Sequence, residues 1–424
     1  MQKIPNGLVI SLCTTFIILL LPVSSLESKE LSPGECRVKK WQLPVSLPIP
    51  NPAQTVPPLI PLPKSPFLCC EGDASCLDRQ LWGENGKGPD KKALLTAIAY
   101  SLRYLQTSRA DAAYKRYAIS GITRQRVISS LQRFRELLLQ SKSPEELNAA
   151  IAREFVFYQS VGSDGKGTVL FTAYYEPLYD ASRIPTKEYR YPIYRLPPDF
   201  DSWQKPHPTR FELEGADGLQ GSKGKLRGLE LFWFRDRLQP YIIQIEGSAR
   251  LQFPDGTQTT VGYAGSTAYN YKSLGRQLVE DGKLPLEGLT MPKILDYFQK
   301  HPQDLNAYIS RDRSFVFFQD KHGAPAQGAL RIPLTAERSI ATDKSFMPPG
   351  ALALIRAPFP FLDSNGSIEH RIVSRYVPDQ DTGGAIKGAG RVDYFLGTGQ
   401  EAGDRAGVTV SNGQLYYLLL KSDK

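Results

Sequence analysis

The feature that most constrains the fold is the way Gly and Pro divide the chain after residue 168 into short runs of β-branched and aromatic residues. Such runs, bounded by turn-forming residues, are typical of β-strands. Because no regular helices alternate with them, the pattern favours β-barrels over a doubly wound sheet. The predicted strands are Val169–Tyr175, Tyr189–Arg195, Glu230–Phe234, Tyr241–Glu246, Phe315–Gln319, Ala351–Ile355, Val392–Leu396 and Leu415–Leu420.

Helical periodicity is confined mainly to residues 90–158, which precede the predicted strands. Apolar residues recur there at three- and four-residue steps from Leu94 to Leu105 and again from Val127 to Leu139. The segment Ser143–Glu146 matches a helix start, with Ser as the N-cap and Pro in the first turn. Two shorter helices are predicted within the β-rich region, at Leu274–Glu280 and Pro292–Lys300. The sequence thus predicts a mainly β protein with N-terminal helices.

Residues 1–25 are typical of a secretory signal, with Lys3 as the one charge and small residues at the end. The apolar run from Leu8 to Val23 has about 16 residues, fewer than the roughly 20 of a membrane span. Left uncleaved, the same run would act as an anchor. Leu12 precedes Cys13 where a lipobox needs a small residue, so lipid attachment is not predicted. We therefore expect an exported protein of the periplasm or cell envelope, with or without membrane association.

Residues 26–80 are predicted to be a Pro-rich tether. From Pro44 to Pro66, nine of 23 residues are Pro, which favours an extended polyproline II conformation. The alternative is a Pro-rich ligand for a partner domain. The tether contains Cys36, Cys69, Cys70 and Cys76. In an exported protein these four cysteines allow two disulfides, and the strain of a ring between neighbours favours pairing of Cys69 and Cys70 with the other two.

The net charge of the chain bears on the chemical class of its binding partner. It has 52 Lys and Arg against 43 Asp and Glu, a formal charge of +9, which favours a polyanionic partner. The basic residues are not interleaved with aromatic residues on one short face, which argues against nucleic acid. The four His are scattered along the chain, so no His-built metal site is predicted, and no motif calls for a cofactor.

Chemistry-bearing residues concentrate in residues 380–407, which contain eight Gly together with Asp381, Asp393 and Asp404. Asp393 lies in the alternating run Val392–Phe395, so its carboxyl should face opposite to the side chains on either side of it. A carboxyl beside aromatic rings is expected to have a raised pKa, which suits a general acid or base. The alternative is a strand Asp that bonds nearby backbone amides.

The segment Asp381–Gly383 also matches the short signature of aspartic proteases. That chemistry needs two such carboxylates that share a proton. The chain has one D-T-G segment, so a protease would require a homodimer and would leave the preceding residues unexplained.

Several blocks in fixed order resemble the MltA-type membrane-bound lytic murein transglycosylases, with their MltA-specific insert domain and 3D domain. The resemblance covers about residues 168–420. Its blocks are FTAYYEP (171–177), YPIYRLP (191–197), YIIQIEGSARLQFPDG (241–256), VGYAGSTAYNYKSLG (261–275), RSFVFF (313–318), IPLTAERSIATDKSFMPPGA (332–351) and the Gly- and Asp-rich stretch.

The resemblance implies a fold. A double-ψ β-barrel would be assembled from residues 81–176, which supply helices and a first strand, and from residues 327–424, the 3D region. A second β-barrel domain, residues 177–326, would be inserted between these two parts. A substrate groove would lie between the two barrels.

The resemblance also implies an activity. Such enzymes are exotransglycosylases that cleave the β-1,4 bond between N-acetylmuramic acid and N-acetylglucosamine and form 1,6-anhydromuramic acid. Glycosidases ordinarily need two carboxylates, but here the C6 hydroxyl of the substrate is the nucleophile, so one carboxyl suffices. Asp393, in the block GRVDYF, matches the catalytic acid and base. Substrate-binding roles are implied for Thr172, Tyr174, Tyr175, Gln244, Glu246, Ser248, Asp381, Gly383 and Gly384. For the two Tyr, core packing is the alternative.

Two positions depart from the family pattern. Glu246 stands where the family usually has an uncharged residue, often Gln, and Ala249 replaces the second Gly of the same block. The implied partners are peptidoglycan glycan strands and proteins of cell-wall synthesis or division, and a monomer is expected. Two other functions stay open, namely a non-catalytic peptidoglycan-binding or scaffold protein on the same fold, or a hydrolytic glycosidase.

Overall fold

The structure, a computed structural model, describes residues 57–66, 74–84, 87–117, 119–363 and 365–421. The predicted signal and the cysteines before Cys76 lie outside these ranges. Within them, none of the helices combines the length and the apolar character that crossing a bilayer requires.

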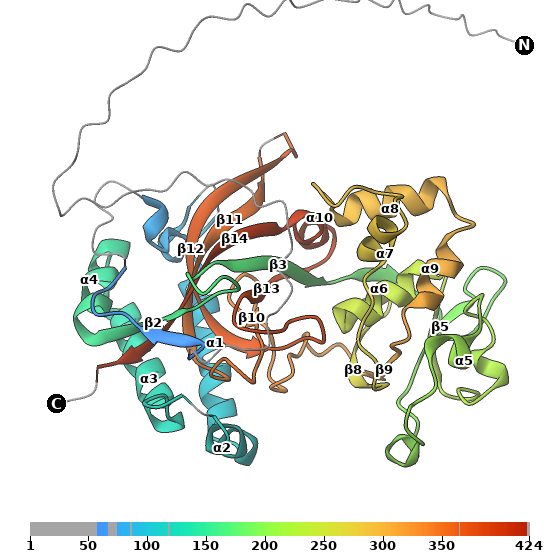
Figure 1. The fold of residues 1–424 in the computed structure, drawn as a ribbon, viewed down its shortest axis with the longest axis horizontal. Coiled ribbons are helices and arrows are strands. Elements are labelled where there is room, and N and C mark those ends of the chain that lie inside the picture. The colour runs from blue at the N-terminus through green and yellow to red at the C-terminus, as the bar shows by residue number, and fades with distance from the viewer. Residues whose placement is uncertain (1–56, 67–73, 85–86, 118, 364, 422–424) are drawn as a thin grey trace, which may run out of the picture. The chain divides into compact units, whose positions relative to one another are not determined.

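Six strands form a closed barrel (Figure 1). They are β3 (Val169–Glu176), β10 (Ile340–Ala341), β11 (Leu352–Leu362), β12 (Ile368–Asp381), β13 (Arg391–Thr398) and β14 (Val410–Leu420). The hydrogen-bonded order is β14-β11-β12-β10-β13-β3, and an additional pairing of β14 with β3 closes the ring. The β13–β3 and β10–β12 pairs are parallel. This ring agrees with the predicted mainly β fold, in which one barrel is built from segments on both sides of residues 177–326.

Strand β14 closes the barrel because its successive segments pair with different neighbours. Residues 410–413 pair with β3, and Leu415–Tyr417 lie within the pairing with β11. At the junction lies Gly413, where a Cβ atom would stand 2.3 Å from the carbonyl oxygen of Arg356. The absence of a side chain there lets the two strands approach each other.

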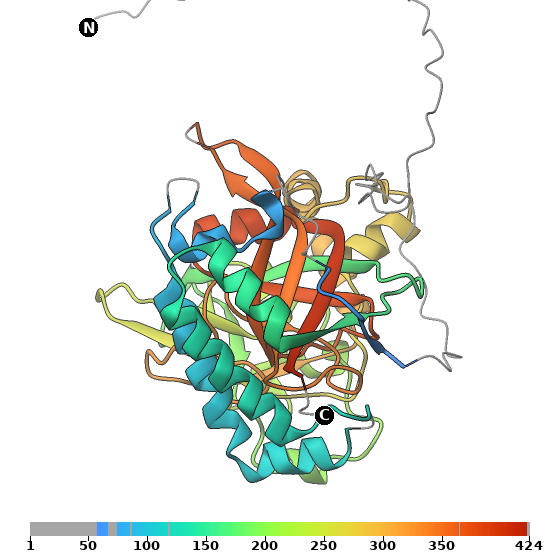
Figure 2. The same ribbon diagram turned by 90° about the vertical axis from the view of Figure 1, so that its left-hand side faces the viewer.

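The predicted helical region is confirmed up to Glu154, whereas its last residues, 155–158, belong to strand β2 (Phe155–Ser160). Its helices are α1 (Lys91–Leu105), α2 (Ser108–Lys115), α3 (Arg124–Gln140) and α4 (Pro144–Glu154). The Ser143 hydroxyl accepts the backbone N–H of Glu146 at 3.2 Å, which is the predicted N-cap. Helix α1 contacts β12 and α3 contacts β14, so the helices cover the outside of the barrel (Figure 2).

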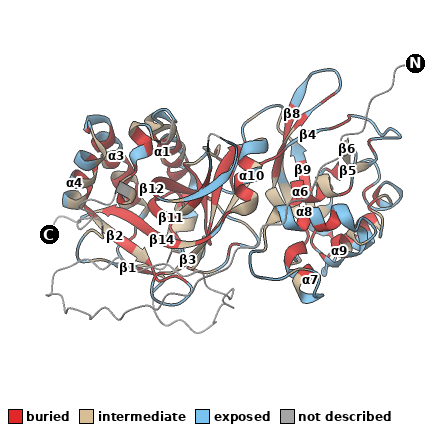
Figure 3. Ribbon diagram, turned by 90° about the horizontal axis from the view of Figure 1, so that it is seen from above, coloured by how far each residue is buried: buried red, intermediate tan, exposed pale blue. Residues whose placement is uncertain are grey.

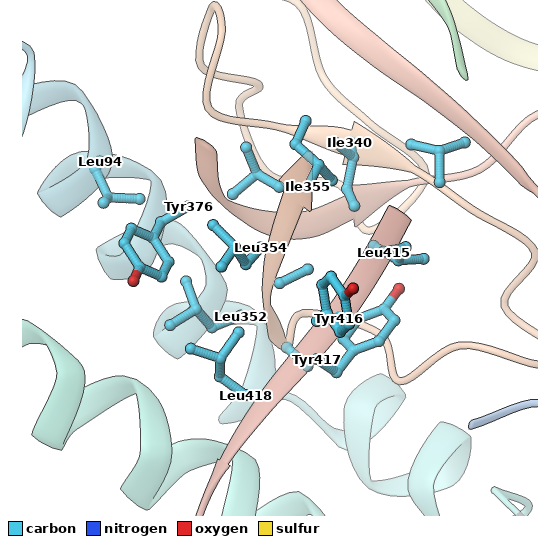
Figure 4. Packing of buried hydrophobic residues seen from close by; sticks show 14 of the residues in the cluster. Leu94, Ile340, Leu352, Leu354, Ile355, Tyr376, Leu415, Tyr416, Tyr417 and Leu418 are labelled. Carbon is cyan, nitrogen blue, oxygen red and sulfur yellow. The ribbon is translucent and has the colours of Figure 1, made fainter. Parts of the chain in front are cut away.

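The barrel and these helices share one hydrophobic core. Figure 4 shows Leu94 of α1 beside Tyr376 of β12, with Leu352 and Leu354 of β11 next to them. All four side chains are buried. Figure 3 shows that buried residues gather on the strands and on the inner sides of the helices. Burial of such side chains is the main favourable term in folding.

A second β region lies between β3 and β10 in the sequence. Its strands are β4 (Leu178–Asp180), β5 (Tyr191–Tyr194), β6 (Glu230–Phe234), β7 (Ser248–Gln252), β8 (Gln258–Ser266) and β9 (Val316–Asp320). They form a four-stranded sheet, β4-β7-β8-β9, and a two-stranded sheet, β5-β6. Isolated bridges, Ser182 to Trp233 and Arg195 to Phe318, connect the two sheets at both edges. The arrangement agrees with the expected inserted barrel, and it has hydrophobic clusters of its own.

Six further helices complete the described chain. They are α5 (Arg210–Glu214), α6 (Leu238–Glu246), α7 (Leu274–Glu280), α8 (Met291–Lys300), α9 (Leu305–Arg311) and α10 (Gln400–Val408). Helices α7 and α8 confirm the two that the sequence predicts within the β-rich region.

One predicted strand is wrong: residues 241–246 belong to helix α6. Pro240 lies in the first turn, where a missing N–H costs no hydrogen bond, and Gly247 ends the helix with a φ of 77°. Tyr241, Ile242 and Ile243 are consecutive and all buried. A helix buried on several sides has the same continuous apolar run as a buried strand, so periodicity could not separate the two.

The predicted tether also needs correction at its described end. Residues Leu59–Pro61 form an edge strand, β1, which pairs with β2 (Phe155–Ser160), and Leu59 is buried. Edge strands tolerate Pro because their outer N–H groups need no partner in the sheet. Cys76 is buried and disulfide-bonded. Asp78 is buried too, and its Oδ1 accepts a hydrogen bond from Arg338 Nη2 at 3.2 Å.

Candidate active site

Asp393 lies on β13 directly opposite Thr172 of β3 in the parallel pair. The Thr172 hydroxyl donates a hydrogen bond to Asp393 Oδ1 at 2.7 Å. Val392 and Tyr394 on either side are fully buried, whereas Asp393 itself is partly exposed. The strand thus directs the Asp393 carboxyl away from the barrel core, as its alternation predicts.

Opposing effects act on the Asp393 carboxyl. Burial raises its pKa, while the Arg391 guanidinium and the Thr172 hydrogen bond lower it, and the pKa remains above its usual value. Arg391 lies two residues before Asp393 on the same strand, and its Nη2 donates to the Thr172 hydroxyl oxygen at 2.9 Å. Thr172 therefore joins the cation and the acid in one hydrogen-bonded chain. A carboxyl with a raised pKa is suited to give a proton and to take one back.

Asp381 ends β12 with both carboxyl oxygens occupied. Its Oδ2 accepts the Tyr174 hydroxyl at 2.8 Å, and its Oδ1 accepts the backbone N–H groups of Ala329 and Thr382 at 2.7 and 2.8 Å. Burial raises the pKa of Asp381, although these donors lower it in part. The Tyr174 ring packs against Phe395, with the ring centroids 5.2 Å apart. Asp381 is thus well placed to hold the surrounding loops.

Glu246, the last residue of α6, reaches the strand that carries Thr172. Its Oε2 accepts the backbone N–H of Tyr175 at 3.2 Å. Burial and the nearby Asp393 raise the pKa of Glu246 to about 8. The structure thus brings Glu246, Tyr175 and Asp393 together although they are far apart in the sequence.

The loop after β12 contains Gly383 and Gly384. A Cβ at Gly383 would lie 3.2 Å from Ile386, whereas one at Gly384 would meet nothing within 4 Å. Asp343 holds the far end of the loop, because its Oδ2 accepts the Gly388 N–H at 2.9 Å.

Gln244 and Ser248 do not join this cluster. The Gln244 side-chain oxygen accepts Arg210 Nη2 at 2.8 Å and the backbone N–H of Val316 at 3.1 Å, and its side chain is buried. Ser248 is also buried, on β7 opposite Gly262. The Gln244 side chain thus connects α6 to Arg210 and to β9 within the second β region.

Arg391 is a site residue that was not predicted from the sequence. The available signal was its position two residues before Asp393, which places both side chains on the same side of a strand. The Arg391 Nε atom is buried and has no hydrogen-bond partner among the described residues. In those same residues, no group of three or more His, Cys, Asp and Glu could hold a metal ion.

Comparisons with known proteins agree with this arrangement. The family model of the MltA specific insert domain matches residues 170–319, and that of the 3D domain matches residues 338–419. Membrane-bound lytic murein transglycosylase A of Escherichia coli K12 is 33% identical over 264 residues, which cover 62% of this chain and 68% of that protein. The chain belongs to the MltA family.

Other MltA-family proteins show similar matches. The Vibrio cholerae membrane-bound lytic murein transglycosylase A is also 33% identical, over 62% of this chain and 68% of its own length. The crystal structure of a membrane-bound lytic murein transglycosylase from Agrobacterium tumefaciens has a TM-score of 0.62 at 29% identity, with 81% of this chain and 95% of that chain covered. E. coli MltA with bound chitohexaose has a TM-score of 0.60 at 27% identity, with 77% and 90% covered.

Proposed function

We propose that this MltA-family chain is a lytic transglycosylase of peptidoglycan. It cleaves the β-1,4 bond between N-acetylmuramic acid and N-acetylglucosamine and leaves a 1,6-anhydromuramic acid end. Family membership supports the class of reaction. The observation that carries the mechanism is the partly exposed Asp393, which has a raised pKa and a hydrogen bond from Thr172.

In the proposed reaction Asp393 acts twice. Protonated Asp393 first gives its proton to the glycosidic oxygen, and the bond from that oxygen to C1 of muramic acid breaks. The C6 hydroxyl of the same sugar then attacks C1, and the Asp393 carboxylate takes the hydroxyl proton. The acid is regenerated, and no water is consumed. One carboxyl suffices because the substrate supplies the nucleophile, unlike the two-carboxylate glycosidases.

The surroundings of Asp393 support both steps. Burial favours the protonated form that the first step needs. Arg391 and Thr172 favour the carboxylate that the second step needs. The hydrogen bond from Thr172 also fixes the carboxyl in one orientation.

The glycan strand is proposed to lie in a groove between the barrel and the inserted region, next to Asp393. The chitohexaose bound by E. coli MltA supports a site for several linked sugars. The loop of Gly383 and Gly384 would let the glycan strand approach the backbone, because neither residue has a side chain and a Cβ at Gly384 would meet nothing within 4 Å. Tyr174 and Asp381 are proposed to hold that loop, and Tyr175 to offer its ring to a sugar face.

We also propose that the protein is exported and acts as a monomer in the cell envelope. The names of its relatives, which are membrane-bound murein transglycosylases, support this location. Its proposed partners are peptidoglycan and, beyond it, proteins of cell-wall synthesis or division.

The proposal is tested by mass spectrometry of murein digested with the wild type and with Asp393→Asn. The wild type should release fragments lighter by one water, which end in 1,6-anhydromuramic acid. The variant should release none yet still sediment with murein. Asp404→Asn is the matched control, because Asp404 is exposed on α10, and its activity should be unchanged.

Other outcomes would identify the alternatives. Reducing-end products from the wild type would indicate a hydrolase, and intact murein that retains bound protein would indicate a binding protein. An active Asp393→Asn variant would overturn the assignment of the acid.

A further inference from the structure

Glu246 is a carboxyl group placed where an ionised carboxylate would be poorly stabilised. It is partly buried at the end of α6, and one backbone N–H, that of Tyr175, donates to it. None of the groups that shift its pKa is a cation. Removing an unpaired carboxylate from water is costly, and such a group takes up a proton instead.

The groups around Glu246 reinforce this preference. They are Tyr175 of β3, Tyr179 of β4, Tyr271 before α7 and Asp393 of β13, and each interacts electrostatically with Glu246. The three Tyr are neutral near pH 7, and burial raises their pKa values further. Asp393 adds negative charge when ionised. Burial and Asp393 therefore favour the neutral acid at Glu246, and the hydrogen bond from the Tyr175 N–H offsets them only in part.

A neutral carboxyl group has hydrogen-bonding abilities that a carboxylate lacks, since it carries one donor besides its acceptors. Oε2 accepts the Tyr175 N–H, whereas Oε1 has no hydrogen-bond partner among the described residues. Oε1 is not sealed from solvent either. Oε1 is therefore reached by solvent, and a proton carried there is available to a ligand.

We propose that Glu246 binds the glycan strand as a neutral acid, with its O–H donating a hydrogen bond to an uncharged sugar oxygen next to the bond that is cleaved. This inference rests on the proposed function, and it assigns to Glu246 a donor role rather than a second proton transfer. Ionisation removes the donor and places a second negative charge beside Asp393. Substrate binding should therefore weaken as Glu246 loses its proton, at about pH 8.

The test is calorimetric binding of chitohexaose to the full chain at pH 6 and pH 9. For the wild type we expect affinity to fall about fivefold between these values, the net worth of one hydrogen bond. Glu246→Gln keeps a donor and an acceptor but cannot ionise. It should bind at both pH values about as tightly as the wild type does at pH 6.

Glu246→Leu is the second variant, since it keeps the size of the side chain and removes the donor. It should bind weakly and equally at both pH values, and circular dichroism should show an unchanged fold. A pH dependence that persists in Glu246→Gln would overturn the inference. Equal binding by Glu246→Leu and the wild type at pH 6 would do so as well.

Murein cleavage separates this inference from the proposed function. If Asp393→Asn is inactive but Glu246→Gln keeps the wild-type pH dependence of binding, the transglycosylase assignment stands and the role of Glu246 fails. If Asp393→Asn remains active while Glu246→Gln loses that pH dependence, Glu246 binds as proposed and the acid is misassigned. Loss of cleavage by Glu246→Gln to the same extent as by Asp393→Asn would make Glu246 a proton donor in the reaction and overturn its role as a binding group.

Discussion

At the scale of single residues, Thr172 connects Arg391 to Asp393 through two hydrogen bonds. Its hydroxyl oxygen accepts from Arg391, so its one proton is free to be donated to Asp393. The direction of the two hydrogen bonds is thereby fixed. Since Arg391 Nε already lacks a partner among the described residues, loss of Thr172 would leave more of that buried guanidinium unsatisfied.

Replacement of Thr172 by Val keeps the shape of the side chain and removes both hydrogen bonds. The Asp393 carboxylate loses a donor, so its already raised pKa rises further. Activity that needs protonated Asp393 is present below that pKa and lost above it, so the pH optimum should move upward. We expect kcat/KM at the optimum to fall about tenfold, the effect of one well-placed hydrogen bond.

The control is Thr168→Val, because Thr168 makes a similar 2.7 Å hydrogen bond to Asp164 in an exposed loop. The measurement is the rate of anhydro-product release over a range of pH. The control variant should give the same pH profile as the wild type. A Thr172→Val profile that coincides with the wild type would show that the hydroxyl does not act on Asp393.

The orientation of Asp393 was predictable because it depends on strand alternation alone. Arg391 follows the same rule. The Thr172–Asp393 contact was not predictable from these residues themselves, because it depends on which strands are neighbours. The hydrogen bond from Arg210 to the Gln244 side chain was not predictable either, since this segment is a helix and not the predicted strand.

At the scale of secondary-structure elements, the barrel depends on a close approach between β14 and β11. A Cβ on Gly413 would lie 2.3 Å from the Arg356 carbonyl oxygen and 2.5 Å from the Ala357 Cβ. The first is a backbone atom and the second is bonded directly to the backbone. Neither can move aside as the end of a long side chain could.

Gly413→Ala should therefore destabilise the protein by about 3 kcal/mol, the upper part of the range for overpacked cores. Gly384→Ala is the control, because a Cβ there meets nothing within 4 Å. Urea denaturation followed by circular dichroism should give a lower midpoint for the first variant alone. Equal midpoints would mean that the strands can separate without cost.

Most elements were predictable because their signals are local. Helix periodicity and the Ser143 cap located the helices that cover the barrel. The pairing of the strands was not predictable from local signals, since β3 pairs with β13 and β14 across the whole inserted region. Local propensity contains no information on such partners, and the resemblance to MltA-type enzymes implied only that the segments before and after the insert form one barrel.

At the scale of the whole molecule, one buried cation joins the segment before α1 to the barrel. Arg338, fully buried, donates to Asp78 at 3.2 Å and to Asp90 at 2.7 Å. It also donates to the backbone carbonyl of Tyr376 at 3.0 Å. These hydrogen bonds satisfy the guanidinium, so burial of its charge is compensated.

Arg338→Leu should leave the buried Asp78 without its main partner and lower the free energy of unfolding by about 3–5 kcal/mol. Arg371→Leu is the matched control, because Arg371 pairs at 2.8 Å with the exposed Glu369. Exposed pairs contribute at most about 1 kcal/mol. Thermal unfolding should separate the two variants clearly, and similar melting temperatures would contradict a stabilising role for the Arg338 network.

The order of the barrel strands along the chain has a consequence for biosynthesis. Thr172 and Asp393 are 221 positions apart, and β3 finds its neighbours only in β13 and β14. A ribosome must therefore translate the whole insert before β3 can pair, and such distant pairings form slowly. A nascent chain that stops before β13 contains Thr172 but has no acid opposite it. The proposed murein-cutting site is thus complete only after β13 has been synthesised and has paired with β3.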